Sequence, residues 1–201
     1  MSIKAGVGMS QHHNPNVAGR EAAGQALEKA GISKPEFVFM FGSIGYDQHS
    51  LLQAVREATG GAPLTGCSAA GTINGDDADE SNFSIVVTVI SSDELHWTNG
   101  IATGLEDDPR AVGKQVAEEL LPHLSADTIG LFVFPDGLTE NFDHFIAGLE
   151  GNLPSDRFIP LWGGGAGNNL NLGKPTYQYC DDEVESDGVS YALLSGEAQT
   201  A

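Results

Sequence analysis

The chain has 201 residues, 40% of them hydrophobic, and a formal net charge of −19 from 28 acidic and 9 basic side chains. This length and composition suit one large domain or two small ones with a buried core, and the negative charge excludes nucleic acid as an expected partner. Two cysteines make no disulfide framework, and neither a signal peptide nor an apolar run of membrane-spanning length is present, so a cytoplasmic protein without membrane insertion is expected.

The first half of the chain predicts alternating strands and helices. Alanine recurs every fourth residue from Ala18 to Ala30 and Gly31 follows, which is typical of a helix and its end. The unbroken apolar run over 37–41 indicates a buried strand, and Asp47 is suited to cap the helix after it. The expected order is a strand over 3–8, a helix over 18–30, a strand over 37–41, a helix with Leu51, Leu52, Val55 and Ala58 on one side, a strand over 63–65, a glycine-rich loop over 66–71 and a strand over 84–90.

The second half predicts the same order. It consists of a strand near 97–102, a helix over 110–121, a strand over 129–134, a helix over 141–149, a strand over 158–162, a glycine-rich loop over 163–167, and strands near 177 and 189–194.

The two halves also resemble each other in sequence. Residues 39–43 are echoed by 132–136 and residues 18–27 by 111–120 at a shift of 93, whereas 64–71 is echoed by 161–167 at a shift of 97. We therefore predict an α/β fold of two pseudo-repeated βαβαβ-type halves, with a mixed, mostly parallel sheet and antiparallel additions. The halves are expected at 1–94 and 95–195, followed by a polar tail over 196–201.

Ligands of such folds bind outside the carboxyl ends of the strands, where short loops here are rich in glycine or polar residues. We expect the loops 42–47, 66–71, 135–141 and 163–169 to converge at one cleft. Glycine amides in two of these loops could hold a carboxylate, and Asp136 could hold an ammonium group, which together suit a small zwitterion. The alternative is that these glycines only allow the loops to pack.

Cys67 is the candidate for an enzymatic reading, because Gly66-Cys67-Ser68 follows a predicted strand as a nucleophile does. The spacing of a nucleophile elbow is missing, however, and no histidine lies in a second motif that would activate the thiol. A thiol-dependent hydrolase or transferase therefore remains an alternative to a buried, inert cysteine, and no catalytic residue is expected.

The histidines show no spacing of metal ligands, so no metal site is expected; they are His12, His13, His49, His96, His123 and His144. A single histidine can still be an axial ligand of haem, so a haem-binding gas sensor stays open as an alternative.

Taken together, these motifs resemble the FIST N domain. The residues that carry the resemblance are Gly8-Met9-Ser10, 18–23, Phe41-Gly42-Ser43 with Tyr46-Asp47, 66–71, 134–138 with Asn141, and 163–167. The resemblance implies a non-catalytic sensory domain of intracellular signal transduction that binds amino acids or similar small metabolites, and it implies nitric-oxide-sensing haem proteins among the relatives.

The resemblance also implies partners. These are a downstream signalling protein such as a histidine kinase or cyclase, and a carboxyl-terminal FIST domain, which we expect to be absent from this sequence. The expected ligand-binding residues are Ser43, Tyr46, Asp47, Gly66, Cys67, Ser68, Gly71, Asp136, Asn141, Gly163, Gly164 and Gly165.

Overall fold

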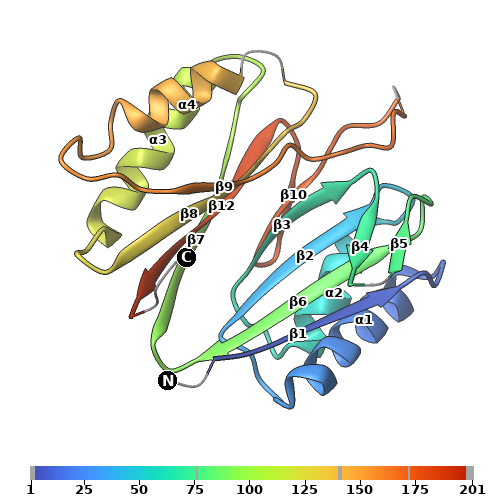
Figure 1. The fold of residues 1–201 in the computed structure, drawn as a ribbon. Coiled ribbons are helices and arrows are strands. Elements are labelled where there is room, and N and C mark those ends of the chain that lie inside the picture. The colour runs from blue at the N-terminus through green and yellow to red at the C-terminus, as the bar shows by residue number, and fades with distance from the viewer. Residues whose placement is uncertain (1–2, 76, 140–141, 172, 198–201) are drawn as a thin grey trace.

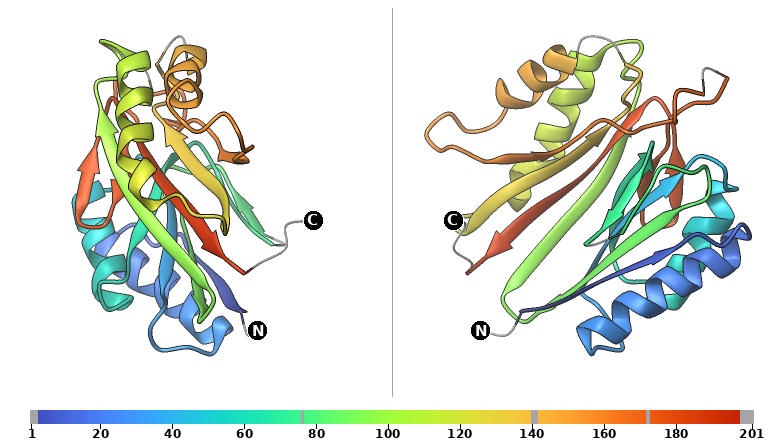
Figure 2. Two further views of the ribbon diagram at one scale, coloured as in Figure 1. Left: turned by 90° about the vertical axis from the view of Figure 1, so that its left-hand side faces the viewer. Right: turned by 45° about the vertical axis from the view of Figure 1, so that its right-hand side comes forward.

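The structure, a computed structural model, describes residues 3–75, 77–139, 142–171 and 173–197. Two large sheets pack face to face, and each carries a pair of helices on its outer side (Figure 1). Helices α1 and α2 cover the first sheet, whereas α3 and α4 cover the second, so the molecule has four layers, as Figure 2 shows from two further directions. None of the helices in the described part of the chain is both long and apolar enough to cross a membrane.

The first half forms the elements that its hydrophobic pattern predicts. Asn14 caps α1 by accepting hydrogen bonds from the amides of Asn16 and Val17, and Gly31 ends it with a φ of 64°. The buried alanines of α1 let the helix lie close against β1. The elements are β1 (Ile3–Ser10), α1 (Pro15–Ala30), β2 (Phe37–Ser43), α2 (Gln48–Ala58), β3 (Leu64–Ala69), β4 (Thr72–Asn74), β5 (Asp77–Asp79) and β6 (Ile85–Ser92).

The second half repeats this order of elements. Asp108 caps α3 by accepting a hydrogen bond from the amide of Ala111. The elements are β7 (Leu95–Thr103), α3 (Pro109–Leu120), the 3₁₀ turn η1 (Leu121–His123), β8 (Thr128–Pro135), α4 (Phe142–Glu150), β9 (Leu161–Gly163), β10 (Gln178–Cys180), β11 (Glu183–Glu185) and β12 (Gly188–Gly196).

The α/β class with mixed sheets is confirmed, but parallel pairing is rarer than expected. The first sheet has the order β1-β6-β2-β3-β10-β11 and the second β7-β12-β8-β9, while β4 and β5 pair with each other. Only β2–β3 and β8–β9 are parallel among the strand pairs of the described residues. The reason is that β6 and β12, the last strands of their halves, insert antiparallel between the first and second strands, which a βαβ pattern alone does not reveal.

The two sheets share one plan, since β1-β6-β2-β3 and β7-β12-β8-β9 are the same order of successive strands. Gly66 and Gly163 show the equivalence at atomic level: their φ angles are 156° and 149°, and a β-carbon on them would overlap the carbonyl oxygens of Met40 and Val133, respectively. The helices correspond at a shift of 94 (113 − 19), because a β-carbon added to Gly19 would meet the carbonyl oxygen of Leu51, as one added to Gly113 would meet that of Phe145. The shift of 93 inferred for the helix from sequence is wrong by one residue.

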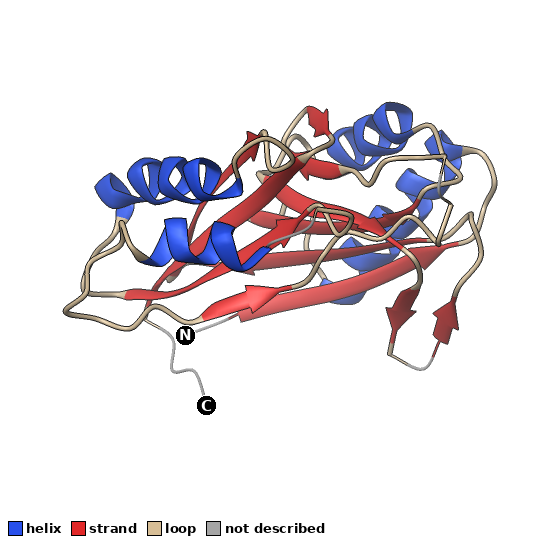
Figure 3. Cartoon of the chain, turned by 90° about the horizontal axis from the view of Figure 1, so that it is seen from above, coloured by secondary structure: helices blue, strands red, loops and turns tan. Residues whose placement is uncertain are grey.

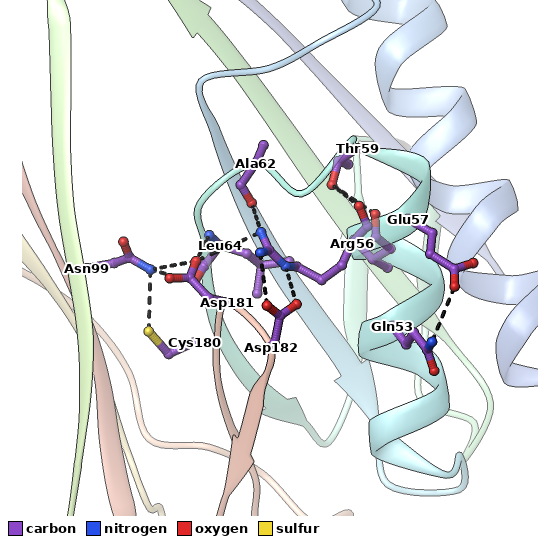
Figure 4. Close-up of polar contacts among 11 residues, drawn as sticks. Gln53, Arg56, Glu57, Thr59, Ala62, Leu64, Asn99, Cys180, Asp181 and Asp182 are labelled. Carbon is purple, nitrogen blue, oxygen red and sulfur yellow. Dashed lines mark hydrogen bonds and ion pairs between the residues drawn. The ribbon is translucent and has the colours of Figure 1, made fainter.

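One hairpin breaks the separation between the halves. After β9 the chain crosses to the first sheet, where β10 pairs antiparallel with β3, placing Tyr179 opposite Gly66. The turn of this hairpin is held by Arg56 of α2, whose Nε lies 2.9 Å from a carboxylate oxygen of Asp182 (Figure 4). Asn99 of β7 donates to the carbonyl oxygen of Leu64 at 3.0 Å, next to the same turn. The hairpin is therefore fixed by both halves.

The space between the sheets is filled mainly by aromatic side chains. Phe37 stacks on Trp97 with ring centroids 4.3 Å apart, and Phe39 meets Phe132 at 5.0 Å. Polar bonds join the halves at the carboxyl ends of the strands. There Ser190 donates its hydroxyl to the carbonyl oxygen of Gly66 at 2.6 Å. Burial of these rings makes the two halves one hydrophobic unit.

Two strand predictions differ from the structure. Strand β3 continues through residues 64–69, so the first glycine-rich segment is largely strand and not the predicted loop. Gly66 can stay in the strand because its unusual φ keeps the pairing with β2 intact. Conversely, β9 begins only at Leu161, and Phe158, predicted to start it, is 88% exposed.

Candidate functional site

A pocket of about 380 Å³ lies at the carboxyl ends of β8 and β9, on the side covered by α4. One wall is formed by Gly163, Gly164 and Gly165 at the end of β9, which we call the glycine segment, and the opposite wall by the first two turns of α4. The floor is formed by β8. Its lining residues are Val133, Pro135, Asp136, Gly137, Thr139, Phe142, Ile146, Leu161, Trp162, Gly163, Gly164 and Gly165. This size lies within the range of small-molecule sites.

Asp136 is the acidic residue among the lining residues of this pocket, and it also lines a neighbouring pocket of about 580 Å³. It follows β8, and its Oδ1 accepts hydrogen bonds from the amide of Leu138 at 2.8 Å and the hydroxyl of Thr176 at 2.7 Å. Its backbone amide is held by the carbonyl oxygen of Gly188 at 2.8 Å. No described residue donates to Oδ2, so this oxygen remains able to accept a hydrogen bond from a ligand.

The glycine segment brings backbone groups to the pocket. A side chain at Gly163 is excluded by the close approach to β8, and the Gly164 amide donates to the carbonyl oxygen of Val133 at 3.3 Å. The amide of Gly165, an exposed residue, has no acceptor among the described residues. The pocket therefore combines one carboxylate oxygen, one open backbone donor and an apolar wall, which can hold an ammonium group, a carboxylate and a hydrocarbon side chain.

Four of the predicted site residues, Asp136 and 163–165, line this pocket. Three others from the first half are not among the residues that line it. Ser43 is fully buried and its hydroxyl has no partner within the described chain, Tyr46 donates its hydroxyl to the carbonyl oxygen of His12 at 3.1 Å, and Asp47 caps α2 by accepting from the Ser50 amide.

The predicted residues of the first glycine segment lie on β3 or just after it. Ser68 connects two of the expected loops, because its hydroxyl donates to the carbonyl oxygen of Gly167 at 2.8 Å and its carbonyl accepts from the Gly167 amide at 2.8 Å. Gly66 and Cys67 lie within the strand, and Gly71 is exposed beside Asp79. Asn141 lies outside the described residues.

Cys67 lies in the core between the sheets and is 5% exposed. Burial raises the pKa of its thiol to about 12. Because only the thiolate is nucleophilic, we expect iodoacetamide to label Cys67 far more slowly than a free thiol at pH 8. The rate should keep rising above pH 9, where labelling of a free thiol levels off. Labelling at the free-thiol rate at pH 8, followed by mass spectrometry, would instead revive the enzymatic alternative.

No cluster of three or more histidine, cysteine, aspartate or glutamate side chains suited to a metal ion occurs within the described ranges. His13 stacks on Phe83 with ring centroids 4.5 Å apart. This stacking gives His13 a packing role.

The apolar part of the pocket is what the sequence reading missed. Phe142 and Ile146 come from α4 and are spaced four residues apart, so both face the glycine segment. Trp162 and Leu161 precede the glycines directly. The sequence contains one signal for this wall, which is a pair of apolar residues four positions apart at the start of a predicted helix that precedes a glycine-rich segment. Thr176, which fixes Asp136, is distant in sequence and gives no such signal.

Comparison with known proteins gives one family. The model of the FIST N domain matches residues 36–201. No curated protein matches the chain.

Among solved structures, a cyanuric acid hydrolase matches with a TM-score of 0.48 and 12% identity, covering 96% of this chain and 69% of that one. A second, from A. caulinodans, matches with a TM-score of 0.47 and 11% identity over 98% and 72% of the two chains. A chorismatase gives a TM-score of 0.42 and 12% identity over 100% and 56%.

Proposed function

The chain belongs to the FIST N domain family, whose members are sensory domains in signal transduction, and from this premise we propose that it binds a small amino acid in the pocket between β9 and α4. The observation that carries the proposal is the free Oδ2 of Asp136 beside an apolar wall. The ammonium group would bind this oxygen, and the side chain would contact Phe142 and Ile146. The carboxylate would accept a hydrogen bond from the Gly165 amide. No catalytic step is part of this proposal.

The proposed output is a change in contact with a downstream signalling protein such as a histidine kinase or a cyclase. The pocket suits this role because it lies at the molecular surface and one wall is a helix. A ligand that contacts α4 and the glycine segment together would favour the arrangement that brings them closest.

The Asp136→Asn variant is expected to bind leucine or phenylalanine about 10- to 100-fold more weakly, as befits loss of one charge-assisted hydrogen bond. Asparagine keeps an oxygen that can accept from the Leu138 amide and the Thr176 hydroxyl, so the loop should stay in place. Binding is measured by titration calorimetry and by the fluorescence of Trp162, which lines the pocket. N-acetyl-leucine, which lacks the ammonium group, should bind the natural chain as weakly as leucine binds the variant.

The matched control is Asp143→Asn, which removes the same charge from an exposed position of α4 outside the pocket lining. Its affinity for the amino acid should stay within about twofold of the natural chain. Equal affinity of the natural chain and Asp136→Asn for leucine, with unchanged melting of both, would refute the assignment of Asp136.

A further inference from the structure

The pocket between β9 and α4 has a counterpart in the first half, and there it is filled. Val133, Pro135 and Gly163 correspond to Met40, Gly42 and Gly66 by the matching registers of β2–β3 and β8–β9. The side chain of Tyr179 occupies the equivalent place in the first half.

Tyr179 lies opposite Gly66, next to Gly42 and Met40, and donates its hydroxyl to Gln48 of α2. The pocket in the second half is thus equivalent to the space that Tyr179 of the β10–β11 hairpin fills in the first half.

The β4–β5 hairpin matches the β10–β11 hairpin but, within the described residues, pairs with neither of the large sheets. β4 pairs with β5 in the register Thr72↔Asp79 and Asn74↔Asp77, and β10 pairs with β11 as Gln178↔Glu185 and Cys180↔Glu183, which is the same register at a shift of 106 (178 − 72). Gly75 and Asp181, at equivalent positions of the two turns, both have a left-handed φ, 61° and 51°.

The two hairpins nevertheless differ in their partners. The β10–β11 hairpin completes a sheet, whereas β4–β5 forms a sheet of its own and projects from the body of the molecule (Figure 3).

The chemistry of the unpaired hairpin fits the open pocket. Ile73 stands where Tyr179 stands in the other hairpin, and it is 73% exposed. Phe142 stands where Gln48 stands, at the helix shift of 94 (142 − 48), and it is 38% exposed. The hydrogen-bonded pair of Tyr179 and Gln48 in the first half thus corresponds to two apolar residues. One of these, Ile73, lies on the β4–β5 hairpin, and the other, Phe142, lines the open pocket. Because Tyr179 and Gln48 contact each other, their exposed apolar counterparts Ile73 and Phe142 are suited to contact each other as well.

The edge of β9 also offers the backbone groups that β10 uses on β3. In the first half the Asp181 amide donates to the carbonyl oxygen of Leu64 at 3.0 Å, and the Ser68 amide donates to that of Tyr177 at 2.8 Å. The equivalent groups on the second half are the carbonyl oxygen of Leu161 and the amide of Gly165. Neither has a hydrogen-bond partner outside the sheet among the described residues. Such an open edge is a template for a further strand.

We propose that β4 of a second copy of this chain pairs antiparallel with β9 and inserts Ile73 into the pocket. In this register Ile73 lies opposite Gly163, as Tyr179 lies opposite Gly66. The Gly75 amide would donate to the carbonyl oxygen of Leu161, and the Gly165 amide to that of Gly71. Each copy carries one donor hairpin and one acceptor edge, so the contact joins copies head to tail.

One charged residue of the first half, Arg56, has an acidic counterpart in the second half, and this difference determines how the proposed association depends on salt. Arg56, which binds Asp182 in the turn of the filled hairpin, corresponds to Glu150 at the helix shift of 94 (150 − 56). A carboxylate there faces a donor hairpin that carries Asp77 and Asp79. We therefore expect association to tighten as the sodium chloride concentration rises and these charges are screened. The Glu150→Arg variant should associate several-fold more tightly than the natural chain.

The first experiment is sedimentation equilibrium of the full chain over a wide concentration range in 0.5 M sodium chloride. The natural chain should associate reversibly, and Ile73→Glu should weaken association by at least about 100-fold, because it places a charge in an apolar seat. Leu170→Glu is the control, since Leu170 is 90% exposed and lies outside hairpin and pocket; it should associate like the natural chain. A natural chain that stays monomeric at millimolar concentration would overturn the proposal.

A complementation experiment separates donor from acceptor. Ile73→Glu retains an intact acceptor edge, and Phe142→Glu retains an intact hairpin while placing a charge in the pocket at the exposed first position of α4, where glutamate is tolerated. Each variant alone should be monomeric, and an equal mixture should form a heterodimer. A mixture that remains monomeric, when the natural chain associates, would show that another surface is responsible.

This inference shares its pocket with the proposed amino acid site, and the overlap is the only part that rests on the proposed function. A ligand and Ile73 of the second copy would compete, so leucine should dissociate the natural assembly. Failure of the two proposals can be told apart: a natural chain that stays monomeric but binds leucine supports the ligand site alone, whereas association without any leucine binding supports the hairpin contact alone.

Discussion

Alanine at position 66 is expected to lower the free energy of unfolding by about 4–5 kcal/mol, which is a large share of the stability of a typical domain. A β-carbon there would overlap the carbonyl oxygen of Met40, an atom of the neighbouring strand, and the φ of 156° is one that residues with side chains rarely adopt. Neither β3 nor β2 can move without disturbing the core between the sheets. Urea denaturation followed by circular dichroism measures the loss.

The matched control is Gly24→Ala in α1. Its β-carbon would meet nothing within 4 Å, so the substitution should raise stability by about 0.5–1 kcal/mol through helix propensity. Gly163→Ala should behave like Gly66→Ala, because its β-carbon would overlap Val133 in the same manner. If position 66 tolerates alanine with a change below about 1 kcal/mol, the close strand approach described for both halves is wrong.

The second large effect is expected at Tyr179, the fully buried residue of β10. Tyr179→Ala removes the side chain that fills the space between β3 and α2, and a cavity of this kind costs about 3–5 kcal/mol. It also leaves Gln48 without its donor. The hairpin should detach from β3 before the rest of the molecule unfolds. Hydrogen exchange at the Ser68 amide, which donates to the carbonyl oxygen of Tyr177, should therefore accelerate more than exchange at β6.

Phe158→Ala is the control for this prediction. Phe158 is an aromatic residue of the same half and is 88% exposed, so its loss should change stability by less than about 0.5 kcal/mol. Uniform acceleration of exchange throughout the first sheet in Tyr179→Ala would contradict the separate detachment of the hairpin.

The sequence allowed the elements to be predicted well where the apolar period was strong. The unbroken run over 37–41 and the alanine repeat of α1 both led to the correct element. The sheet order was less accessible, because nothing in the residues of β6 or β12 reveals that they insert between the first and second strands of their halves. Strand pairing depends on contacts between distant residues, whereas helices depend on local ones. For the same reason the sequence predicts a loop around Gly66, where the structure has β3.

The candidate site could be predicted only in its second half. Asp136 and the glycines after β9 are recognisable because they follow buried strands, and the structure places them around one pocket. The same pattern in the first half leads to Cys67 and Ser68, which pack against a hairpin that comes more than one hundred residues later in the chain. Equivalent motifs have different surroundings in the two halves, because the hairpin fills one copy of the pocket and leaves the other open.

The crossing of β10 and β11 to the first sheet has a consequence for the order in which the molecule can be built during synthesis. Strand β3 is made early, yet its edge is paired only by residues 178–180, so it stays exposed until most of the chain has left the ribosome. A nascent chain of the first half alone therefore presents an open strand beside apolar residues of α2. The time needed to synthesise residues 178–180 is therefore the time for which this strand edge is open to aggregation or to chaperones.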